Sequence, residues 1–592
     1  MSIITLNKVT VFGLGIDKPK VLEGLQTLGC MHLIPMQPLP KETEFGSSDR
    51  YEDAKKALHY IMDVPRRRHQ VRDEAQFDLD QFLAEVQVNK QKQREAEDKR
   101  LFLANRLKNL EPWGNFTLPD LDELGGYQLW FYQVPHTKAK HIREIELPWQ
   151  IVGEDHLNVY VVIIAKEEPP SNVLPVPRTH AGSVSPEELQ RQLEQVEIEL
   201  DEIWAEQEAL SRWIFLLSKN LVRAEDQAVL QEASGQTKEE EGFFLVQGWM
   251  PKRNLKQLEL FSEQEGLAFL AEPPQPEETP PTLMENPPTL KGGEALVTFY
   301  ETPGYRTWDP STIVFFSFAL FFAMILADAG YALLLWVGLI YFWKQMGQSA
   351  SGRSTRIYAV VILTASVIYG VMVGSYFGVA PGNGSLLASL NVLNLQNFDG
   401  MMQLSITIGC LHLAFANAVV AYRAVGFPGK AQPIGWIAVI FGGFTWVILG
   451  WQNLAIGLLA GGFFVVFLGA FLGSRQKFPL RLVDGFGALT GITKLFGDVL
   501  SYLRLFALGL ASGSLAVTFN TLAQQVMAAI PELGLLLGPL ILLLGHTINL
   551  GMAILACFVH GVRLNVIEFF NWGLSEEGYP FHAFTKKEHS NG

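Results

Sequence analysis

The chain has 592 residues, of which 48% are hydrophobic, a mean hydropathy of +0.17 and a formal net charge of −14. The charges are unevenly spread: residues 1–300 hold 32 Lys/Arg and 49 Asp/Glu, whereas residues 301–592 hold 14 and 11. The acidic first half excludes the basic face that nucleic acid requires, and three distant cysteines without a CxxC motif argue against a disulfide framework or a cysteine metal site.

The N-terminus, MSIITLNKVT, lacks a basic segment followed by an apolar core. No cleavable signal peptide is therefore expected, and the acidic half is predicted to stay in the cytoplasm.

Three patches of the first half have the alternation typical of small αβ units. Residues 3–36 are predicted to form a strand, a helix and a second strand, and residues 243–271 a strand followed by a helix. Residues 126–165 contain two strand-like runs, YQLWFYQV and LNVYVVIIA. We expect a proximal lobe from residues 1–48 and 240–271, and a distal lobe from residues 118–168.

Two polar helices are predicted between these patches, at residues 50–110 and 185–233. The second begins with a capping Ser185 followed by Pro186 at the first helical position. Its apolar residues follow a heptad seam: Leu189, Leu193, Val196, Leu200, Ile203, Leu210, Ile214, Leu217 and Leu221. The first helix carries a looser stripe: Phe77, Phe82, Leu83, Val86, Leu103, Leu107 and Leu110.

We expect the two helices to pair as an antiparallel coiled coil between the lobes, which would give an α+β cytoplasmic dumbbell. An ordinary solvated helical hairpin is the alternative. Residues 272–300 begin with a proline-rich stretch and are predicted to be a stiff linker into the second half.

The second half, residues 301–592, is predicted to be an all-α membrane domain. Seven apolar runs are long enough to cross a hydrocarbon core of ~30 Å: 311–343, 357–378, 402–422, 433–451, 453–473, 484–529 and 535–571. The last two are the longest and are expected to be tilted.

Basic loops, such as residues 344–356, should lie in the cytoplasm, whereas residues 379–400 and 529–534 contain no Lys or Arg. With a cytoplasmic N-terminus, this arrangement requires residues 311–343 to cross twice, with a break near Asp328. The sequence therefore predicts about eight crossings and a short cytoplasmic C-terminal tail. Seven crossings, with every later loop reversed, is the alternative.

Polar residues inside the apolar half are the candidate functional residues. Burying an arginine at mid-membrane costs ~2.5–3.5 kcal/mol or more, yet Arg504 and Arg563 both lie in apolar runs. On a helix Arg504 shares its face with Ser501 and Ser512, small residues that let another helix approach. Arg504 could instead be a structural arginine that pairs with an acid on a neighbouring helix. Other polar residues at membrane depth are Asp328, His412, Asp484, Asp498, His546 and Asn549.

These other residues also have structural interpretations. The two histidines are more often packing residues than ligands. Asp484 and Asp498 could lie at the membrane interface, and Asp328 could cap a helix at the break.

Four functional classes compete. An enzyme is disfavoured because the chain contains no Walker A, HExxH or GxSxG motif. A secondary transporter is disfavoured because the two halves of the membrane domain show no repeat. A scaffold gives no reason to bury two arginines. An ion-conducting stator fits best, since a fixed cation can force a passing carboxylate to ionise.

Several motifs resemble those of one family. They are KVTVFGLGIDKPKVLEGLQTLGCMHL, GFFLVQGWMPKRNLKQLE, PPTLKGGEALVTFYETPGYRTWDP, ADAGYALLL, VGSYFG, SYLRLFALGLA and FVHGVRLNVIEFFNWGLSEEGYPFHAF. Together they are similar to the membrane stator subunit, called subunit a or subunit I, of V-type and archaeal-type rotary ATPases, in its prokaryotic branch.

The resemblance implies a non-catalytic, multi-pass subunit of the cell membrane with no cofactor and no metal of its own. Its implied partners are a proteolipid c/K ring, peripheral-stalk E/G heterodimers, the C/d socket of the central stalk and the lipid membrane. Arg504 matches the family's essential arginine and Arg563 its second arginine. Candidates for lining the two half-channels are Asp328, His560, Glu568, Ser501, Ser512, Asp484, Asp498 and Asn549.

The chain departs from the family at two positions. Some members carry a glutamate where this chain has Ala553, and a histidine where it has Ser512. These departures leave the route of each half-channel open. Whether the ion is H⁺ or Na⁺ is also open.

Overall fold

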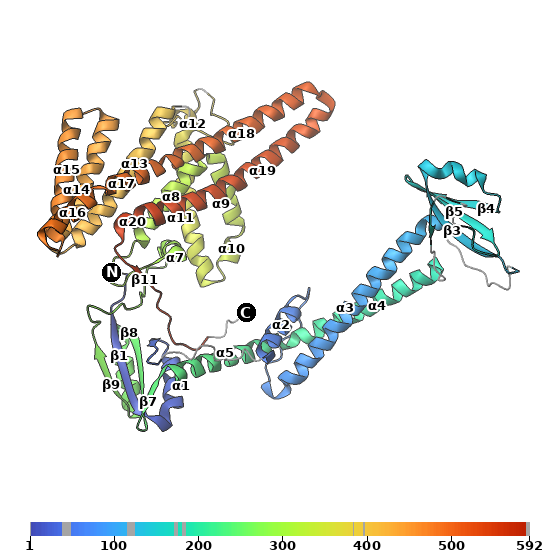
Figure 1. Cartoon of the computed structure of the whole chain (residues 1–592), viewed down its shortest axis with the longest axis horizontal. Coiled ribbons are helices and arrows are strands. Elements are labelled where there is room, and N and C mark those ends of the chain that lie inside the picture. Colours follow the sequence, from blue (N-terminus) through green and yellow to red (C-terminus); the bar gives the residue numbers. More distant parts are fainter. Residues whose placement is uncertain are drawn as a thin grey trace. The chain divides into compact units, whose positions relative to one another are not determined.

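The computed structural model describes residues 2–37, 49–114, 125–170, 174, 176–179, 185–382, 384–394 and 397–587. The chain divides into two compact units, which are described separately below. The first unit comprises Met1–Met36 with Lys238–Thr585, and the second comprises Gln37–Thr237 with Lys586–Gly592 (Figure 1).

The second unit contains a helical hairpin. The predicted cap is confirmed, because Ser185 Oγ accepts a hydrogen bond from the Glu188 amide at 3.3 Å. The helices run antiparallel: Leu189, at the start of the outgoing helix, packs in one cluster with Leu110, at the end of the other. The helical elements are α2 (Asp49–Met62), η2 (Glu74–Gln76), α3 (Leu79–Leu110), η3 (Glu111–Trp113), α4 (Pro186–Leu210), η5 (Ser211–Trp213) and α5 (Ile214–Gln236).

The expectation of one helix over residues 50–110 is wrong, because residues 63–78 separate α2 from α3. Pro65 falls in this segment and has no amide hydrogen to donate. The Arg68 amide donates to Ser211 Oγ at 2.9 Å. This amide of the connecting segment therefore bonds the turn between α4 and α5 and not a carbonyl of a continuous helix.

The distal lobe is a four-stranded antiparallel sheet in the order β4-β5-β3-β6. The two predicted strands are present as β3 and β5, but the expected helical part is only a 3₁₀ segment, and β6 lies beyond the predicted boundary at residue 168. Residues 118–124 of the predicted lobe lie outside the described residues. The elements are β3 (Gln128–Pro135), η4 (His136–Glu144), β4 (Trp149–Glu154), β5 (Asn158–Ala165) and β6 (Arg178–Thr179).

A polar corner stabilises this sheet. The Tyr160 hydroxyl donates to Asp155 at 2.7 Å, and the Leu157 and Asn158 amides donate to the same carboxylate. These hydrogen bonds hold the pKa of Asp155 well below its usual range, at about 2.

The proximal lobe, in the first unit, has a sheet in the order β2-β8-β1-β9, with β7 also paired to β8. The predicted strand-helix-strand unit is present, but β8 lies between its two strands and runs antiparallel to both. Its elements are β1 (Leu6–Leu14), η1 (Gly15–Asp17), α1 (Lys18–Leu28), β2 (His32–Ile34), β7 (Lys238–Glu240), β8 (Phe243–Pro251), η6 (Lys252–Asn254), α6 (Leu255–Glu265) and β9 (Ala268–Glu272).

The dumbbell as a whole stays a prediction, because this lobe and the helical hairpin belong to different units. Residues 38–48 of the predicted lobe lie outside the described residues.

The expected stiff linker over residues 272–300 is wrong in its last third, which forms helix α7 (Lys291–Tyr300). Two adjacent glycines let α7 approach its neighbours closely. A Cβ on Gly293 would lie 2.2 Å from the Ser311 carbonyl oxygen, and one on Gly292 would lie 2.6 Å from the Tyr358 ring.

The rest of the first unit is helical. Short strands β10 (Thr302–Pro303) and β11 (Glu577–Gly578) flank it. Its helices are α8 (Ser311–Leu326), α9 (Ala329–Tyr341), α10 (Trp343–Met346), α11 (Ala350–Val373), α12 (Leu386–Ser389), α13 (Phe398–Arg423), α14 (Gly426–Phe444), η7 (Thr445–Leu449), α15 (Gln452–Gly473), α16 (Phe478–Leu489), α17 (Gly491–Ser501), α18 (Leu503–Ala529), α19 (Pro531–Arg563), η8 (Leu564–Phe569) and α20 (Phe570–Gly573).

Within the described residues, six helical segments are long and apolar enough to cross a membrane, and α8 and α9 are shorter apolar helices. The break expected near Asp328 is confirmed. Ala327 adopts a left-handed conformation with φ 49°, and Asp328 caps the start of α9. Eight crossings remain a prediction.

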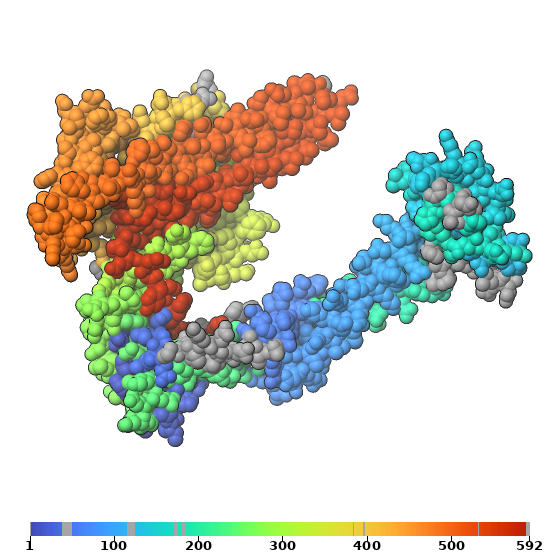
Figure 2. All heavy atoms as spheres, viewed as in Figure 1, coloured from blue at the N-terminus to red at the C-terminus, as the bar shows by residue number. Residues whose placement is uncertain are grey.

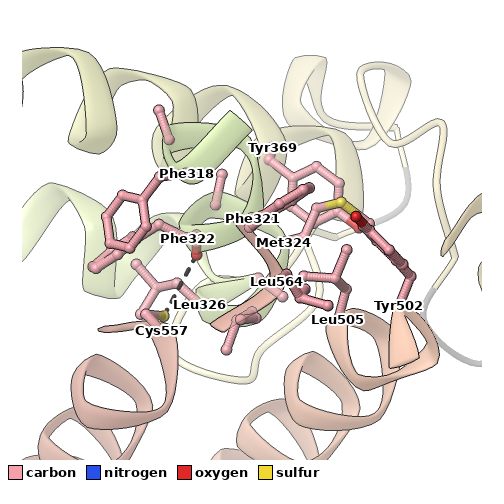
Figure 3. Close-up of a cluster of buried hydrophobic side chains, with 14 of the residues drawn as sticks. Phe318, Phe321, Phe322, Met324, Leu326, Tyr369, Tyr502, Leu505, Cys557 and Leu564 are labelled. Carbon is pink, nitrogen blue, oxygen red and sulfur yellow. Dashed lines mark hydrogen bonds between the residues drawn. The ribbon is translucent and has the colours of Figure 1, made fainter. Parts of the chain in front are cut away.

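A buried apolar core holds these helices together (Figure 3). Phe318, Phe321 and Phe322 of α8 meet Tyr502, which joins α17 to α18, and Cys557 of α19. Each of these side chains is at most 4% exposed. The core therefore fixes the ends of α18 and α19 against α8.

Candidate functional site

The candidate site lies on the hairpin of α18 and α19, which pack side by side and run in opposite directions (Figures 1 and 2). Arg504 is the second residue of α18 and Arg563 is the last residue of α19. The antiparallel pairing therefore brings the two arginines to the same end of the hairpin.

The core positions Arg504 through its neighbours in sequence. Tyr502 and Leu505 are both 0% exposed (Figure 3), so the start of α18 is held on both sides of the arginine. Arg504 itself is half-buried, and its Nη1 atom is buried without a hydrogen-bond partner. Among the described residues, no carboxylate lies within the 4.0 Å limit of an ion pair with Arg504. The described part of the chain therefore does not seal this guanidinium with an acid.

Glu568 is the acid of the site. It is 1% exposed and lies on the π-helical turn η8, directly after α19. A π-turn inserts an extra residue into a helix, which changes the direction in which later side chains point. Glu568 Oε1 lies 3.7 Å from Arg563 Nε, whereas its Oε2 is buried without a hydrogen-bond partner.

These residues form one electrostatic cluster. Arg504 interacts electrostatically with both Arg563 and Glu568, and His560 with both arginines. His560 Nδ1 is also buried without a partner. We call Arg504, His560, Arg563 and Glu568 the arginine cluster. With His560 neutral, it carries two positive charges and one negative charge. Ser501 lies beside Glu568.

Next to the cluster, the structure adds a pair that was not among the predicted site residues. His412 Nδ1 lies 2.8 Å from the Tyr502 hydroxyl, and its ring stacks on Phe569 with centroids 4.3 Å apart. The sequence interpretation of His412 as a packing residue agrees with this stacking. Asp498, a predicted lining residue, accepts a hydrogen bond from Trp572 Nε1 at 2.7 Å.

Asp328, another predicted lining residue, is 2% exposed and fully engaged. Its Oδ1 accepts hydrogen bonds from the Tyr331 and Phe377 amides, both at 3.0 Å. Its Oδ2 accepts from Ser375 Oγ at 2.6 Å and from the Gly378 amide at 2.9 Å. The carboxylate thus caps α9 and holds the loop after α11.

A second polar group lies further along the hairpin, and we call it the Tyr331–His546 network. His546 Nδ1 is 2.7 Å from the Tyr331 hydroxyl, and His546 Nε2 is 3.0 Å from Asn520 Oδ1. Asn549 Nδ2 donates to the Tyr331 hydroxyl and to the Ser512 carbonyl oxygen, both at 2.9 Å. Ser512 and Asn549 were expected to be site residues. Tyr331 and Asn520 were missed, and their hydroxyl and amide in apolar helices were the available signal.

Asp484, a predicted lining residue, belongs neither to the arginine cluster nor to the Tyr331–His546 network. It is exposed on α16 and accepts a hydrogen bond from Ser474 Oγ at 2.6 Å. Within the described part of the chain, no group of three or more His, Cys, Asp or Glu side chains could hold a metal ion.

Comparisons with known proteins identify relatives of the chain. It is 28% identical over 438 residues to A-type ATP synthase subunit I of Methanocaldococcus jannaschii, covering 66% of this chain and 63% of that protein. It is 29% identical over 413 residues to V-type ATP synthase subunit I of Chlamydia pneumoniae, covering 58% and 61%. The subunit I of Borreliella burgdorferi is 25% identical over 533 residues, covering 83% and 85%.

The resemblance to subunit I of V-type and A-type ATP synthases is confirmed. The matches span about three fifths of the length of the first two relatives. No family model matches the chain. A crystal structure of the cytoplasmic N-terminal domain of a V-ATPase subunit I, 15% identical, covers 45% of this chain and 99% of that one with a TM-score of 0.23, a likeness too weak to bear on the fold.

The likeness to subunit I agrees with the helical composition of the second half. Six helical segments of the described residues are long and apolar enough for a membrane, as expected of a multi-pass membrane protein. The departures noted in the sequence lie on the hairpin of the site. Ala553 is 4% exposed, and the Ser512 side chain is buried with its hydroxyl unpaired.

Proposed function

We propose that the chain is the static membrane subunit of a rotary V/A-type ATPase. It forms two ion half-channels against a rotating proteolipid ring and anchors the peripheral stalks, so that H⁺ or Na⁺ translocation is coupled to rotation. The names of its relatives and the arginine cluster support this proposal.

The unpaired guanidinium of Arg504 is the observation that carries the proposal. A buried donor without a partner destabilises a protein by ~1–3 kcal/mol, and by more when it is charged. Arg504 Nη1 is such a donor, in the first turn of α18, where its neighbours in sequence are apolar. An arginine retained for packing would be paired within the chain. An unpaired arginine is suited to a partner that arrives from outside.

The partner in this proposal is the ion-binding carboxylate of the rotating ring. When the carboxylate arrives with its ion bound, the Arg504 charge favours the bare, ionised form. The ion then leaves through one half-channel, and a new ion binds from the other half-channel after the ring moves on. Because an arginine is always protonated, it also blocks a direct leak between the half-channels.

Arg563 and Glu568 set the charge around Arg504. Their 3.7 Å approach lets the buried carboxylate offset one of the two arginines. The cluster keeps a net charge of about +1 with His560 neutral. That charge suits a single passing carboxylate.

The rest of the chain holds this site against torque. In this proposal the α3–α4 hairpin and its lobes lie in the cytoplasm and bind the feet of the E/G stalks, while the C/d socket connects the ring to the central stalk. Both termini are cytoplasmic. ATP is made or hydrolysed in separate subunits, so this chain is not itself catalytic.

Replacing Arg504 tests the proposal. Arg504→Gln in the assembled complex should abolish ATP-driven ion pumping, because glutamine carries no charge to displace the ion. Arg475→Gln, which removes an exposed arginine from the loop between α15 and α16, is the matched control and should pump like the wild type. Coupled pumping near the wild-type rate in Arg504→Gln would refute the proposal.

Two other functions make different predictions. A stand-alone ion-coupled transporter would be active when this chain alone is placed in liposomes. A scaffold would tolerate Arg504→Gln. The stator subunit should be inactive alone and should co-purify with a proteolipid ring.

A further inference from the structure

The Tyr331–His546 network lies at a different depth from the arginine cluster. α18 and α19 are unbroken between the two sites. At 1.5 Å per residue, Asn520 is about 24 Å along α18 from Arg504, and His546 is about 25 Å along α19 from Arg563. Ser512 lies between, about 12 Å from Arg504. The hairpin therefore carries polar groups at intervals from the arginines toward its turn.

The hydrogen bonds of this network have one consistent direction. Asn520 Nδ2 donates to the Phe377 carbonyl oxygen at 2.8 Å, which leaves Oδ1 to accept from His546 Nε2–H. His546 Nδ1 is then unprotonated and accepts from the Tyr331 hydroxyl, which accepts in turn from Asn549. The imidazole is therefore neutral, and the lone pair on its Nδ1 accepts the proton of the Tyr331 phenol.

A cavity lies beside the network. It has a volume of about 350 Å³, and its lining includes Ser375, Gly378, Ser514 and Val517. The loop of residues 374–379 lines this cavity and also carries the Phe377 carbonyl that holds Asn520. Ser512, whose Oγ is buried without a partner, directly precedes Gly513 of this lining. The cavity thus adjoins the loop and the helix α18 that carry hydrogen-bond partners of the network.

We propose that His546 carries protons in the half-channel on the non-cytoplasmic side, and that the transported ion is H⁺. This inference rests on the proposed function. A chain of imidazole, phenol and amide groups can pass a proton from group to group. It cannot pass Na⁺, because hard cations need several free oxygen ligands and the oxygens here already accept hydrogen bonds.

The proton balance of the step is simple. In this proposal a water molecule carries a proton from the cavity to the Tyr331 oxygen, which binds it and gives its own proton to His546 Nδ1. The resulting imidazolium releases its Nε2 proton to water beside Asn520. One proton enters and one leaves, and tautomer exchange through water resets the ring.

The charged surroundings of His546 are defined within the described residues. It interacts electrostatically with Asp328 of the α8–α9 break and contacts Tyr331 of the same segment. Phe377 packs edge-on with centroids 5.8 Å apart, and Asn520 of α18 completes the shell. The carboxylate of Asp328 stabilises the transient imidazolium.

Two variants test the role of His546. His546→Gln cannot be protonated, and Tyr331→Phe keeps the ring but removes the hydroxyl. ATP-driven acidification of inverted vesicles in sodium-free buffer is measured per assembled complex, from about pH 5.5 to 8.5. His546→Gln should lose about tenfold or more of the pumping rate. Tyr331→Phe should lose less and should change the pH profile, which a merely structural role would not do.

Thr547→Ala is the matched control, because its exposed side chain bonds, among the residues that the structure describes, only the Leu543 carbonyl of its own helix. It should pump like the wild type. Wild-type rates from His546→Gln and Tyr331→Phe at every pH would overturn the inference, as would a sodium requirement of the wild type. If Arg504→Gln abolishes pumping while His546→Gln does not, only this inference fails. If Arg504→Gln pumps normally, the proposed function fails.

Discussion

Asp328 illustrates how a single buried residue can look functional in sequence and serve the fold in the structure. Its carboxylate accepts four hydrogen bonds, two of them from backbone amides beyond α11. Every one of these partners is a donor. An acid with its oxygens occupied in this way ties the α8–α9 break to the loop of residues 374–379. Its first role is therefore to hold both the break and the cavity beside His546.

We predict that Asp328→Asn destabilises the membrane domain. The amide nitrogen that replaces one oxygen would face either the Tyr331 and Phe377 amides or the Ser375 hydroxyl and the Gly378 amide. The hydroxyl can turn to accept, but a backbone amide can only donate, so at least one bond is lost and two donors face each other. Leaving buried donors unsatisfied costs ~1–3 kcal/mol each. The thermal midpoint of the detergent-solubilised chain should fall, and it should fall less for Ser375→Ala, which removes one bond. An unchanged midpoint in Asp328→Asn would contradict this role.

The residues of the two polar groups differ in how far their roles could be predicted from the sequence. The arginines were predictable, because a charge in an apolar run is visible without a fold. His546 was not, because its partners Tyr331 and Asn520 lie 215 and 26 residues away in the chain. A lone histidine in a helix is usually a packing residue, and only the tertiary contacts distinguish the two cases.

At the scale of elements, features that depend on residue spacing within one helix could be predicted from the sequence. Features that depend on tertiary contacts could not. The Ser185 cap depends on spacing within one helix and is confirmed. The seam residues from Leu189 to Ile203 pack in one cluster with α3, whereas the coiled coil itself stays a prediction. The separation of α2 from α3 depends on bonds to the distant Ser211 and was missed. The helix α7 was hidden by the prolines before it, although the glycines that allow its close packing are part of the sequence.

The α3–α4 seam supports a prediction with an internal control. Leu200 is 1% exposed and packs against α3, whereas Ile198, on the same helix, is 61% exposed. Leu200→Ala should cost ~2–5 kcal/mol through the lost burial and the remaining cavity. Ile198→Ala should change stability by less than ~0.5 kcal/mol.

The measurement is hydrogen–deuterium exchange of α3 and α4 peptides in the whole chain across a urea series. The urea midpoint should shift for Leu200→Ala and remain in place for Ile198→Ala. Equal midpoints for the two variants would show that the seam does not hold the helices together.

At the scale of the whole molecule, orientation in the membrane decides which side each site serves. The arginines and the His546 network lie at different positions along the α18–α19 hairpin. The number of membrane crossings that precede this hairpin in the chain therefore decides which side of the membrane each of them is nearer to. Within the described ranges six helical segments are long enough to span a membrane on their own, and the short helices α8 and α9 decide whether the number of crossings reaches eight. Buried Asp328 at their break favours two short helices that meet inside protein, where irregular backbone is tolerated.

Cysteine labelling on intact cells and inverted vesicles tests this orientation. The three native cysteines are buried and should give little background with a membrane-impermeant maleimide. Ser351→Cys introduces an exposed site in the first turn of the span at Ala350–Val373, and Ser389→Cys introduces one after that span. With eight crossings, the first should react only from the cytoplasmic side and the second only from outside. The reverse pattern would mean that residues 311–343 cross once, and it would move His546 to the cytoplasmic half of the ion path.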